Sequence, residues 1–299
     1  MVHIPVLQKQ VLDYLDPKTN ENFIDATFGE GGYAKAILER TKPKGKILGI
    51  EIDPGLYKNK NIEIENNQDF SGRIILVNDS YINLKQIVER EKFYGADGII
   101  FDLGMSSWHL EKSKRGFSFL KNEPLDMRYK DSAGEELTAK EILNEWDARD
   151  LESIFKEYGE ERFAKRIASA IGEFRKKRGI ETTFQLVEVI KKATPAWYHH
   201  KRIHPATRVF QALRIVVNQE LKNIKRALPQ SIEVIKTGGR IIIISFHSLE
   251  DRLIKNFLKV ASKNNLLRVL TKKPITADKE EIRSNPRARS AKLRAAIKL

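Results

Sequence analysis

The residues of this chain that could do chemistry lie in a glycine-rich turn and at the polar ends of three further hydrophobic runs. The turn lies in segment 23–33, where Gly29, Gly31 and Gly32 follow a short hydrophobic run and precede a helical pattern at 34–40. Glycine lets a ligand approach the main chain closely, and a helix start presents unpaired N–H groups. The segment predicts a loop that binds a nucleotide-like cofactor, with a glycine turn that binds nothing as the alternative.

Acidic residues follow two further hydrophobic runs. Glu51 ends the run 46–50 and Asp102 ends the run 95–101. Glu51 lies about twenty residues after the glycine turn, where doubly wound folds place an acid on the ribose hydroxyls. A carboxylate can accept both hydrogen bonds of a vicinal diol, so we expect Glu51 to bind ribose. Asp53, which precedes Pro54, is expected to cap the next helix.

The elements that position these groups are four strand-then-helix units within about 100 residues, a pattern typical of a parallel sheet. Each strand then delivers a polar group to the carboxyl edge of the sheet: the glycine turn, Glu51, the segment 78–81 and Asp102. A nicotinamide enzyme needs mainly the glycine turn and the ribose acid. Four polar strand ends favour an S-adenosylmethionine-dependent methyltransferase, because acids also suit a sulfonium cation.

The chain then changes character. Residues 106–131 have no strong periodicity, and 138–193 read as helices without strand candidates, with a capping box at Thr138 and Glu141. We expect a methyltransferase domain formed by 1–107 and 207–299. Residues 108–206 are expected to form a lid loop and an inserted helical substrate domain. A long helix is predicted to follow His204, running to Leu228.

A further hydrophobic strand, 238–246, is followed by His247 and Ser248. Ser248 is expected to cap the next helix. His247 is then placed at the same edge of the sheet. It is a candidate for orienting a reacting base, and the alternative is a hydrogen-bonded structural histidine.

Composition indicates a polyanionic partner. The formal net charge is +14 and the pI is about 9.7, which favours nucleic acid over a membrane surface. Basic segments 199–208 and 283–294 are expected to contact phosphates, through Arg202, Arg208, Arg287 and Arg289. The histidines of the first segment lack carboxylate or thiol companions, so no metal site is expected. The absence of cysteine and of a signal-peptide pattern fits a cytoplasmic protein.

These motifs together resemble the bacterial RsmH (MraW) methyltransferase family over nearly the whole chain. The segments that carry the resemblance are 3–7, 25–29, 102–104, 115–119, 124–128, 157–160, 204–208, 210–214, 244–251 and 285–290. The resemblance implies a Rossmann-like class I methyltransferase sheet of seven strands with an inserted all-helical domain. It also implies methyl transfer from S-adenosyl-L-methionine to the exocyclic N4 amine of a cytidine. The expected substrate is the decoding region of 16S rRNA, within the 30S subunit.

The cofactor contacts implied by the resemblance fall on Gly31, Gly32, Tyr33, Glu51, Tyr81, Asp102 and His109. Four of these differ from the residues most common in the family: Tyr33 stands for His, Glu51 for Asp, Tyr81 for Phe and His109 for Gln. Tyr33 is expected to contribute its backbone N–H, which does not depend on the side chain. Asp102 and His247 are the candidates for the catalytic group.

The target base must leave its stack, and Trp108, Phe117 or Phe119 is expected to stack on it. Two other classes of function stay open on the sequence. One is a methyltransferase that acts on DNA or free RNA. The other is an RNA-binding assembly factor without catalysis. The sequence predicts no oligomeric state.

Overall fold

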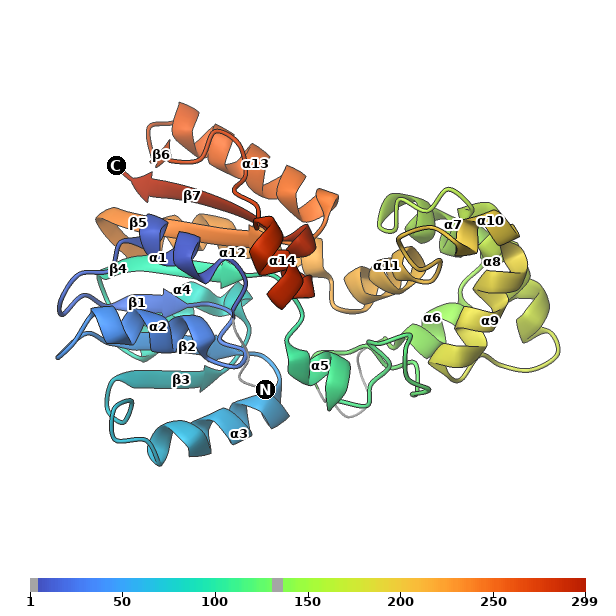
Figure 1. Cartoon of the computed structure of the whole chain (residues 1–299), viewed down its shortest axis with the longest axis horizontal. Coiled ribbons are helices and arrows are strands. Elements are labelled where there is room, and N and C mark those ends of the chain that lie inside the picture. Colours follow the sequence, from blue (N-terminus) through green and yellow to red (C-terminus); the bar gives the residue numbers. More distant parts are fainter. Residues whose placement is uncertain (1–4, 131–136) are drawn as a thin grey trace. The chain divides into compact units, whose positions relative to one another are not determined.

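The structure is a computed structural model, and it describes residues 5–130 and 137–299. The chain divides into two compact units (Figure 1). Within the described residues, the sheet unit has two hydrophobic cores and the helical unit has one. The sheet unit comprises Met1–Gly104 and Leu221–Leu299, and the helical unit comprises Met105–Glu220. The predicted insertion of a helical domain into a sheet domain is confirmed. The boundaries differ from those expected at 107/108 and 206/207, because the helix at 207–217 packs in the helical core.

The sheet unit is built on seven strands in the order β3-β2-β1-β4-β5-β7-β6 (Figure 1). The strands are β1 (Phe23–Asp25), β2 (Ile47–Glu51), β3 (Ile74–Asn78), β4 (Ala96–Asp102), β5 (Ile235–Ser245), β6 (Leu267–Val269) and β7 (Lys292–Lys298). Strands β1 to β5 pair in parallel, and β7 is antiparallel to both of its neighbours. The expected class I methyltransferase sheet is thus confirmed.

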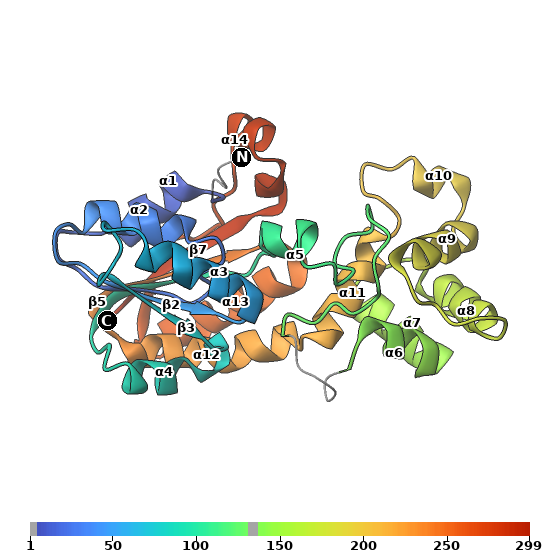
Figure 2. The same ribbon diagram turned by 90° about the horizontal axis from the view of Figure 1, so that it is seen from below.

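Helices cover both faces of this sheet (Figure 2). One face packs on α1 (Gln8–Leu15), α2 (Gly32–Arg40) and α3 (Pro54–Glu65). The other face packs on α4 (Leu84–Arg90), α12 (Glu220–Val234) and α13 (Ser248–Lys263). The alternation of strand side chains explains both cores: Ile241 and Ile243 face one, and Ile242 and Ile244 the other, all buried.

The helical unit holds α5 (Ser107–Glu111), α6 (Ala139–Glu145), α7 (Ala148–Glu157), α8 (Ala164–Arg175), α9 (Thr183–Ala193), α10 (Ala196–His199) and α11 (Thr207–Val217). The predicted capping box is present at the start of α6. The Thr138 hydroxyl accepts from Glu141 N at 3.2 Å, and Glu141 Oε2 accepts from Thr138 N at 2.7 Å. Each bond satisfies an N–H that the helix itself leaves unpaired.

The prediction of one long helix that runs to Leu228 is wrong, because the helix is interrupted between α11 and α12. Gln219 adopts a left-handed conformation with φ 48°. Asn218 Nδ2 donates to Arg214 O at 3.0 Å and to Met127 O at 2.8 Å. Arg214 and Glu220 form a bidentate ion pair across the break, at 2.7 and 3.1 Å. These contacts fix α11 within the helical unit.

The C-terminal basic segment also ends earlier than predicted. The last strand, β7, begins at Lys292, so Lys292 and Arg294 of the predicted segment 283–294 belong to the sheet. Arg294 is buried, and its Nε donates to Asp251 at 2.7 Å. Before β7 lie α14 (Lys279–Ser284) and a 3₁₀ helix, η2 (Pro286–Ser290). The first residues of the N-terminal motif, His3 and Ile4, lie outside the described residues.

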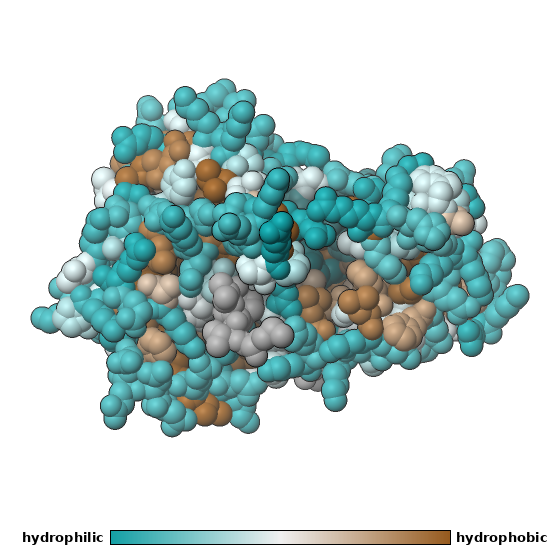
Figure 3. Space-filling model, in the orientation of Figure 1, coloured by the Kyte–Doolittle hydropathy of each residue, from teal (hydrophilic) through white to brown (hydrophobic). Residues whose placement is uncertain are grey.

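Hydrophilic side chains cover most of the face drawn in Figure 3, as expected for a chain with 31% charged residues. Among the helices of the described residues, none combines the length and apolar character that a membrane span needs.

Candidate cofactor site

The glycine turn after β1 requires its glycines. Gly29 and Gly31 have φ of 54° and 76°, a region that other residues rarely adopt. Gly31 is the last residue before α2, and a Cβ built on it would lie 2.9 Å from the Phe28 ring. Because Gly31 has no side chain, a ligand can approach the first N–H groups of α2 closely.

An N-terminal arm covers one side of this helix start. A Cβ on Gly32 would lie 2.3 Å from the Pro5 ring, so the arm and the helix touch closely. Tyr33 is buried, and its hydroxyl donates to Val6 O at 2.6 Å. The Tyr33 side chain thus holds the arm in place. Its proposed contribution of a backbone N–H to the cofactor stays a prediction.

Glu51 ends β2 beside the turn. Its Oε2 accepts from Gly29 N at 2.9 Å and its Oε1 accepts from Asp53 N at 2.8 Å. Burial raises the pKa of Glu51 to about 7, against the effect of these two N–H groups. Each carboxylate oxygen has a second lone pair, so the residue can brace the turn and still accept from a diol. Asp53 caps α3 as predicted, accepting from Gly55 N and Leu56 N.

Asp102 ends β4 at the same edge. Its N–H donates to the Thr27 hydroxyl at 2.7 Å, and its Oδ1 accepts from Gly104 N at 3.2 Å. Burial raises the pKa of Asp102 to about 6, while the hydrogen bond from Gly104 and the neighbouring Tyr33 hydroxyl lower it. The residue remains partly exposed to solvent, so it can meet a ligand directly.

Asp25, the last residue of β1, is a third carboxylate at this edge and was not among the predicted site residues. It is fully buried, and its Oδ1 accepts from Thr27 N at 3.3 Å. Its Oδ2 has no hydrogen-bond partner among the described residues. Burial raises the pKa of Asp25 to about 7, and the charges of Asp102 and Glu51 add to the effect. The available sequence signal was an acid at the end of the strand that leads into the glycine turn.

The three carboxylates stand at the ends of adjacent strands in the order β2, β1, β4. No lysine or arginine forms an ion pair with any of them within the described ranges. Buried acids without a cation carry a free-energy cost that a bound cation would relieve. The site therefore suits a ligand with a positive charge near this edge.

Tyr81 joins the same edge from β3. It begins a 3₁₀ helix, η1 (Tyr81–Asn83), and its ring meets the Phe101 ring edge-on at 6.0 Å. Asn78 Nδ2 donates to Glu51 O at 2.8 Å and ties the end of β3 to the end of β2. Tyr81 thus follows the end of β3, beside the strand that ends in Glu51, and its aromatic contact with the cofactor stays a prediction.

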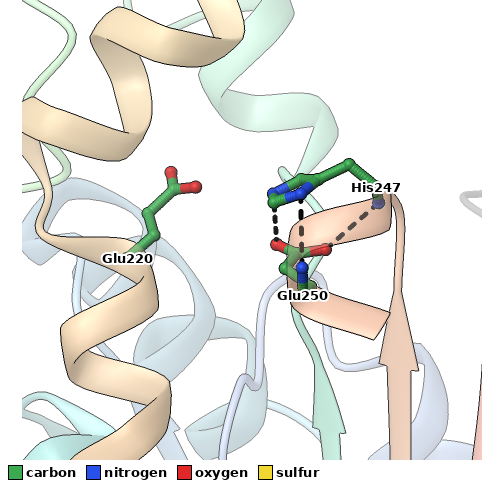
Figure 4. A group of neighbouring side chains, drawn as sticks. All are labelled: Glu220, His247 and Glu250. Atoms are coloured by element: carbon green, nitrogen blue, oxygen red, sulfur yellow. Dashed lines mark hydrogen bonds and ion pairs between the residues drawn. The ribbon is translucent and has the colours of Figure 1, made fainter. Parts of the chain in front are cut away.

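His247 is held by Glu250 rather than left free at the edge (Figure 4). The predicted cap, Ser248, is wrong: His247 is the N-cap of α13, with Nδ1 accepting from Glu250 N at 3.4 Å. Nε2 lies 3.0 Å from Glu250 Oε1, and the His247 N–H donates to Glu250 Oε2 at 3.3 Å. These contacts fit the structural alternative for His247. Figure 4 also draws Glu220, which belongs to the helical unit and pairs there with Arg214.

The seventh predicted cofactor residue, His109, lies in the helical unit. It is buried on α5, with its ring 4.8 Å from Tyr129 and 5.2 Å from Phe117. Its Nδ1 lies 3.1 Å from the Ser106 hydroxyl. The ring therefore has a packing role of its own.

The predicted stacking of Phe117 and Phe119 on a substrate base meets an obstacle. Phe117 is buried and stacks on Tyr129 at 5.3 Å, with the rings 15° apart. Phe119 stacks on His204 at 4.6 Å, with the rings 7° apart. Phe117 is therefore a poor candidate because it is buried, whereas Phe119 is partly exposed with one face stacked on His204, and its stacking on a base stays a prediction. Trp108 is partly exposed on α5.

The four arginines predicted to contact RNA differ in their surroundings. Arg202 and Arg289 are exposed, and Arg287 is partly buried on η2. Arg208 lies in the first turn of α11, and its Nη1 donates to Glu160 O at 2.7 Å. Arg208 is thus partly engaged within the helical unit.

Comparison with known proteins finds similarity along the whole chain. The model of the MraW methylase family matches residues 1–299. A protein of Sulfurihydrogenibium azorense, named ribosomal RNA small subunit methyltransferase H, is 45% identical over 99% of both chains. A protein of the same name from Trichlorobacter lovleyi is 41% identical over 99% of this chain and 98% of its own. Among solved structures, an rRNA methylase from Streptococcus thermophilus aligns over 100% of this chain and 99% of its own. Its TM-score is 0.46 and its identity 10%.

Proposed function

Since the chain belongs to the MraW methylase family, we propose that it methylates the exocyclic N4 amine of a cytidine in the decoding region of 16S rRNA. The methyl donor is S-adenosyl-L-methionine. Relatives that are 40–45% identical over 99% of the chain carry a name that specifies the small ribosomal subunit. That name supports the choice of rRNA, and the family resemblance of the motifs supports the cytidine N4 position.

The observation that carries the proposal is the edge of the sheet where the glycine turn meets three carboxylates. Asp25 Oδ2 is buried without a hydrogen-bond partner among the described residues, and the pKa values of Asp25, Glu51 and Asp102 are all raised. A neutral or anionic cofactor could use one acid for its ribose, but it would not offset the charge of the other two. A sulfonium cofactor with an adenosine ribose fits it, because one acid can serve the diol and the others the cation.

We assign the holding groups as follows. The main chain of Gly31, Gly32 and Tyr33 contacts the cofactor at the start of α2, and Glu51 accepts from the ribose hydroxyls. Tyr81 provides an aromatic contact from the end of β3. His109 remains one of the proposed cofactor residues. Because its ring is buried, its role in this proposal is to position the loop around α5.

The chemistry at the amine requires alignment and a proton acceptor. When bound, the cofactor supplies an activated methyl group on sulfur. The cytosine amine is a weak nucleophile because its lone pair is delocalised into the ring, so holding it in line contributes much of the catalysis. Asp102, partly exposed and with its pKa raised to about 6, can accept a hydrogen bond from the amine and then its proton. His247 is occupied by Glu250 and is the weaker candidate.

The substrate is proposed to bind as rRNA within the 30S subunit in the cytoplasm. The charge of +14 supports attraction to phosphates, and the exposed residues Arg202 and Arg289 are suitable contacts. Arg208 and Arg287 are retained as contacts with smaller expected effects, because both are partly buried. The target base is expected to leave its stack before it reaches Asp102.

The test is methyl transfer from labelled S-adenosylmethionine to 30S subunits that lack the modification, followed by nucleoside digestion and mass spectrometry. Cytidine methylated at N4 is the expected product. Equal transfer to DNA or to naked RNA would favour a methyltransferase with a broader substrate. Tight RNA binding without cofactor binding would favour an assembly factor.

A further inference from the structure

Trp197 is an exposed aromatic side chain on the helical unit that the proposed chemistry does not use. It lies on α10, and 48% of it is exposed. The next residue, Tyr198, is buried, and its hydroxyl donates to Glu161 Oε2 at 2.7 Å. His199 Nε2 lies 2.9 Å from the Thr194 hydroxyl. These contacts anchor α10 and hold Trp197 at the surface.

Cationic side chains surround this ring. The Arg162 guanidinium carbon lies 4.6 Å from the centroid of Trp197 and 4.8 Å from that of Phe163. Lys201 Nζ lies 5.0 Å from the Trp197 ring, and the guanidinium of Arg166 lies 5.8 Å from Phe163. All three cations are exposed. We call Trp197, Phe163, Arg162, Arg166 and Lys201 the Trp197 surface.

The charge of this surface is not neutralised locally. Across the part of the chain that the structure describes, none of its cations forms an ion pair with a carboxylate. The sequence contains no acidic residue between Glu188 and Glu220. Of the two acids just before Arg162, Glu161 is buried and engaged with Tyr198, and Glu160 is exposed. Exposed cations beside an exposed indole suit a polyanion that also carries flat aromatic groups.

Single-stranded RNA has both properties, and we propose that the Trp197 surface binds an unpaired segment of the RNA substrate. A base stacks on the indole or on the guanidinium of Arg162, and the adjoining phosphates contact Lys201 and Arg166. Lys201 is long and exposed, so it can move from the ring to a phosphate and uncover the ring face. This inference rests on the proposed action on RNA and adds a contact distant in sequence from the cofactor residues.

The first test replaces the aromatic ring. Binding of a fluorescent single-stranded RNA from the decoding region is measured by anisotropy for Trp197→Leu and Trp197→Tyr. Loss of a stacked base weakens binding roughly five- to hundredfold, and we expect this for the leucine variant only. Phe184→Leu is the matched control, because Phe184 is also 48% exposed and no cation–ring pair among the described residues includes it. Circular dichroism confirms that each variant folds.

The second test replaces the charges. The double variant Arg162→Gln and Lys201→Gln should lower the salt slope of RNA binding by about 1.4, since each phosphate contact on a single strand contributes about 0.7. The control double variant is Lys177→Gln and Arg178→Gln, where Arg178 also lies over a ring, 5.1 Å from Phe174, and both residues are exposed. An equal slope change in both double variants would overturn the proposal, because it would reflect net charge alone.

Methyl transfer by the unaltered protein separates this inference from the proposed function. If that protein methylates 30S subunits but Trp197→Leu binds RNA as tightly as it does, the Trp197 surface is refuted and the function stands. If Trp197→Leu weakens binding to 30S subunits but not to naked RNA, the partner is a ribosomal protein and the proposal is again wrong. Absence of both RNA binding and methyl transfer in the unaltered protein would refute both.

Discussion

Replacing Asp25 with asparagine should change how the stability of the sheet unit depends on pH. The free energy of unfolding of the variant, relative to that of the unaltered chain, should be higher at alkaline pH than at acidic pH. Asp25 is fully buried, and its pKa is raised from an ordinary 3.8 to about 7. An acid with a raised pKa in the folded state lowers stability as pH increases from its ordinary value through the folded value. Asparagine has no such titration, so the variant escapes this loss.

The size of the effect follows from the two pKa values. At about pH 5 the unfolded carboxyl is already ionised while the folded one is still protonated. Each pH unit from there to the folded pKa of about 7 costs the unaltered chain about 1.4 kcal/mol, or about 3 kcal/mol in total. The new amide can itself lack a partner, which costs about 1–3 kcal/mol at every pH. The variant's relative gain in free energy of unfolding between about pH 5 and about pH 8 does not depend on that cost, because the cost is the same at both pH values.

The assay is urea unfolding of both proteins without cofactor at the two pH values. Far-UV circular dichroism follows both units. Tryptophan emission follows the helical unit alone, because Trp108, Trp146 and Trp197 all lie within Met105–Glu220. The expected change is therefore a shift of the dichroism transition that exceeds any shift of the emission transition.

Asp97→Asn is the matched control on neighbouring strand β4. Its carboxylate forms an ion pair with Lys236 and accepts from Asn22 N at 2.8 Å, so its replacement should destabilise the sheet at about pH 8. If Asp25→Asn is equally destabilised at both pH values, Asp25 is not a buried acid with a raised pKa. The electrostatic account of the site would then be wrong.

Three further predictions address the site and the RNA contacts. Gly31→Ala should weaken cofactor binding at least tenfold by calorimetry and lower stability by about 1–3 kcal/mol, because φ is 76° and the new Cβ would meet Phe28; unchanged affinity would refute the turn as a binding loop. Asp102→Asn should reduce methyl transfer about 100-fold or more while RNA binding is unchanged, and full turnover with normal cofactor affinity would remove Asp102 from the site. Replacing Arg287 and Arg289 with glutamine should lower the salt slope of RNA binding by about 1, most of it from the exposed Arg289; an unaltered slope would remove η2 from the RNA interface.

The sequence was sufficient for the parts of the fold that depend on local pattern. The strand at 240–244 is a run of isoleucines after Arg240, and the glycine turn is marked by its composition. Thr138 and Glu141 stand at the spacing of a capping box and form one. Each of these signals is contained within a few neighbouring residues, so no distant contact was needed to read it.

The remaining features depend on tertiary neighbours. The raised pKa of Asp25 arises from burial and from acids on two other strands, which no local pattern reports. The local sequence allows either His247 or Ser248 as the cap of α13. His247 is the cap because Glu250 contacts both of its ring nitrogens and its main-chain N–H. The break at Gln219 has no glycine or proline to mark it, since it is stabilised by side chains of residues on either side.

The order of the strands has a consequence for synthesis of the chain. Strand β4 ends at Asp102, but its second neighbour, β5, begins at Ile235, after the entire helical unit. At about 5–20 residues per second, the open edge of β4 waits on the order of ten seconds for its partner to leave the ribosome. An unpaired strand edge is a template for association with other chains. A nascent chain stalled in this interval therefore exposes an aggregation-prone edge, which the arrival of β5 closes.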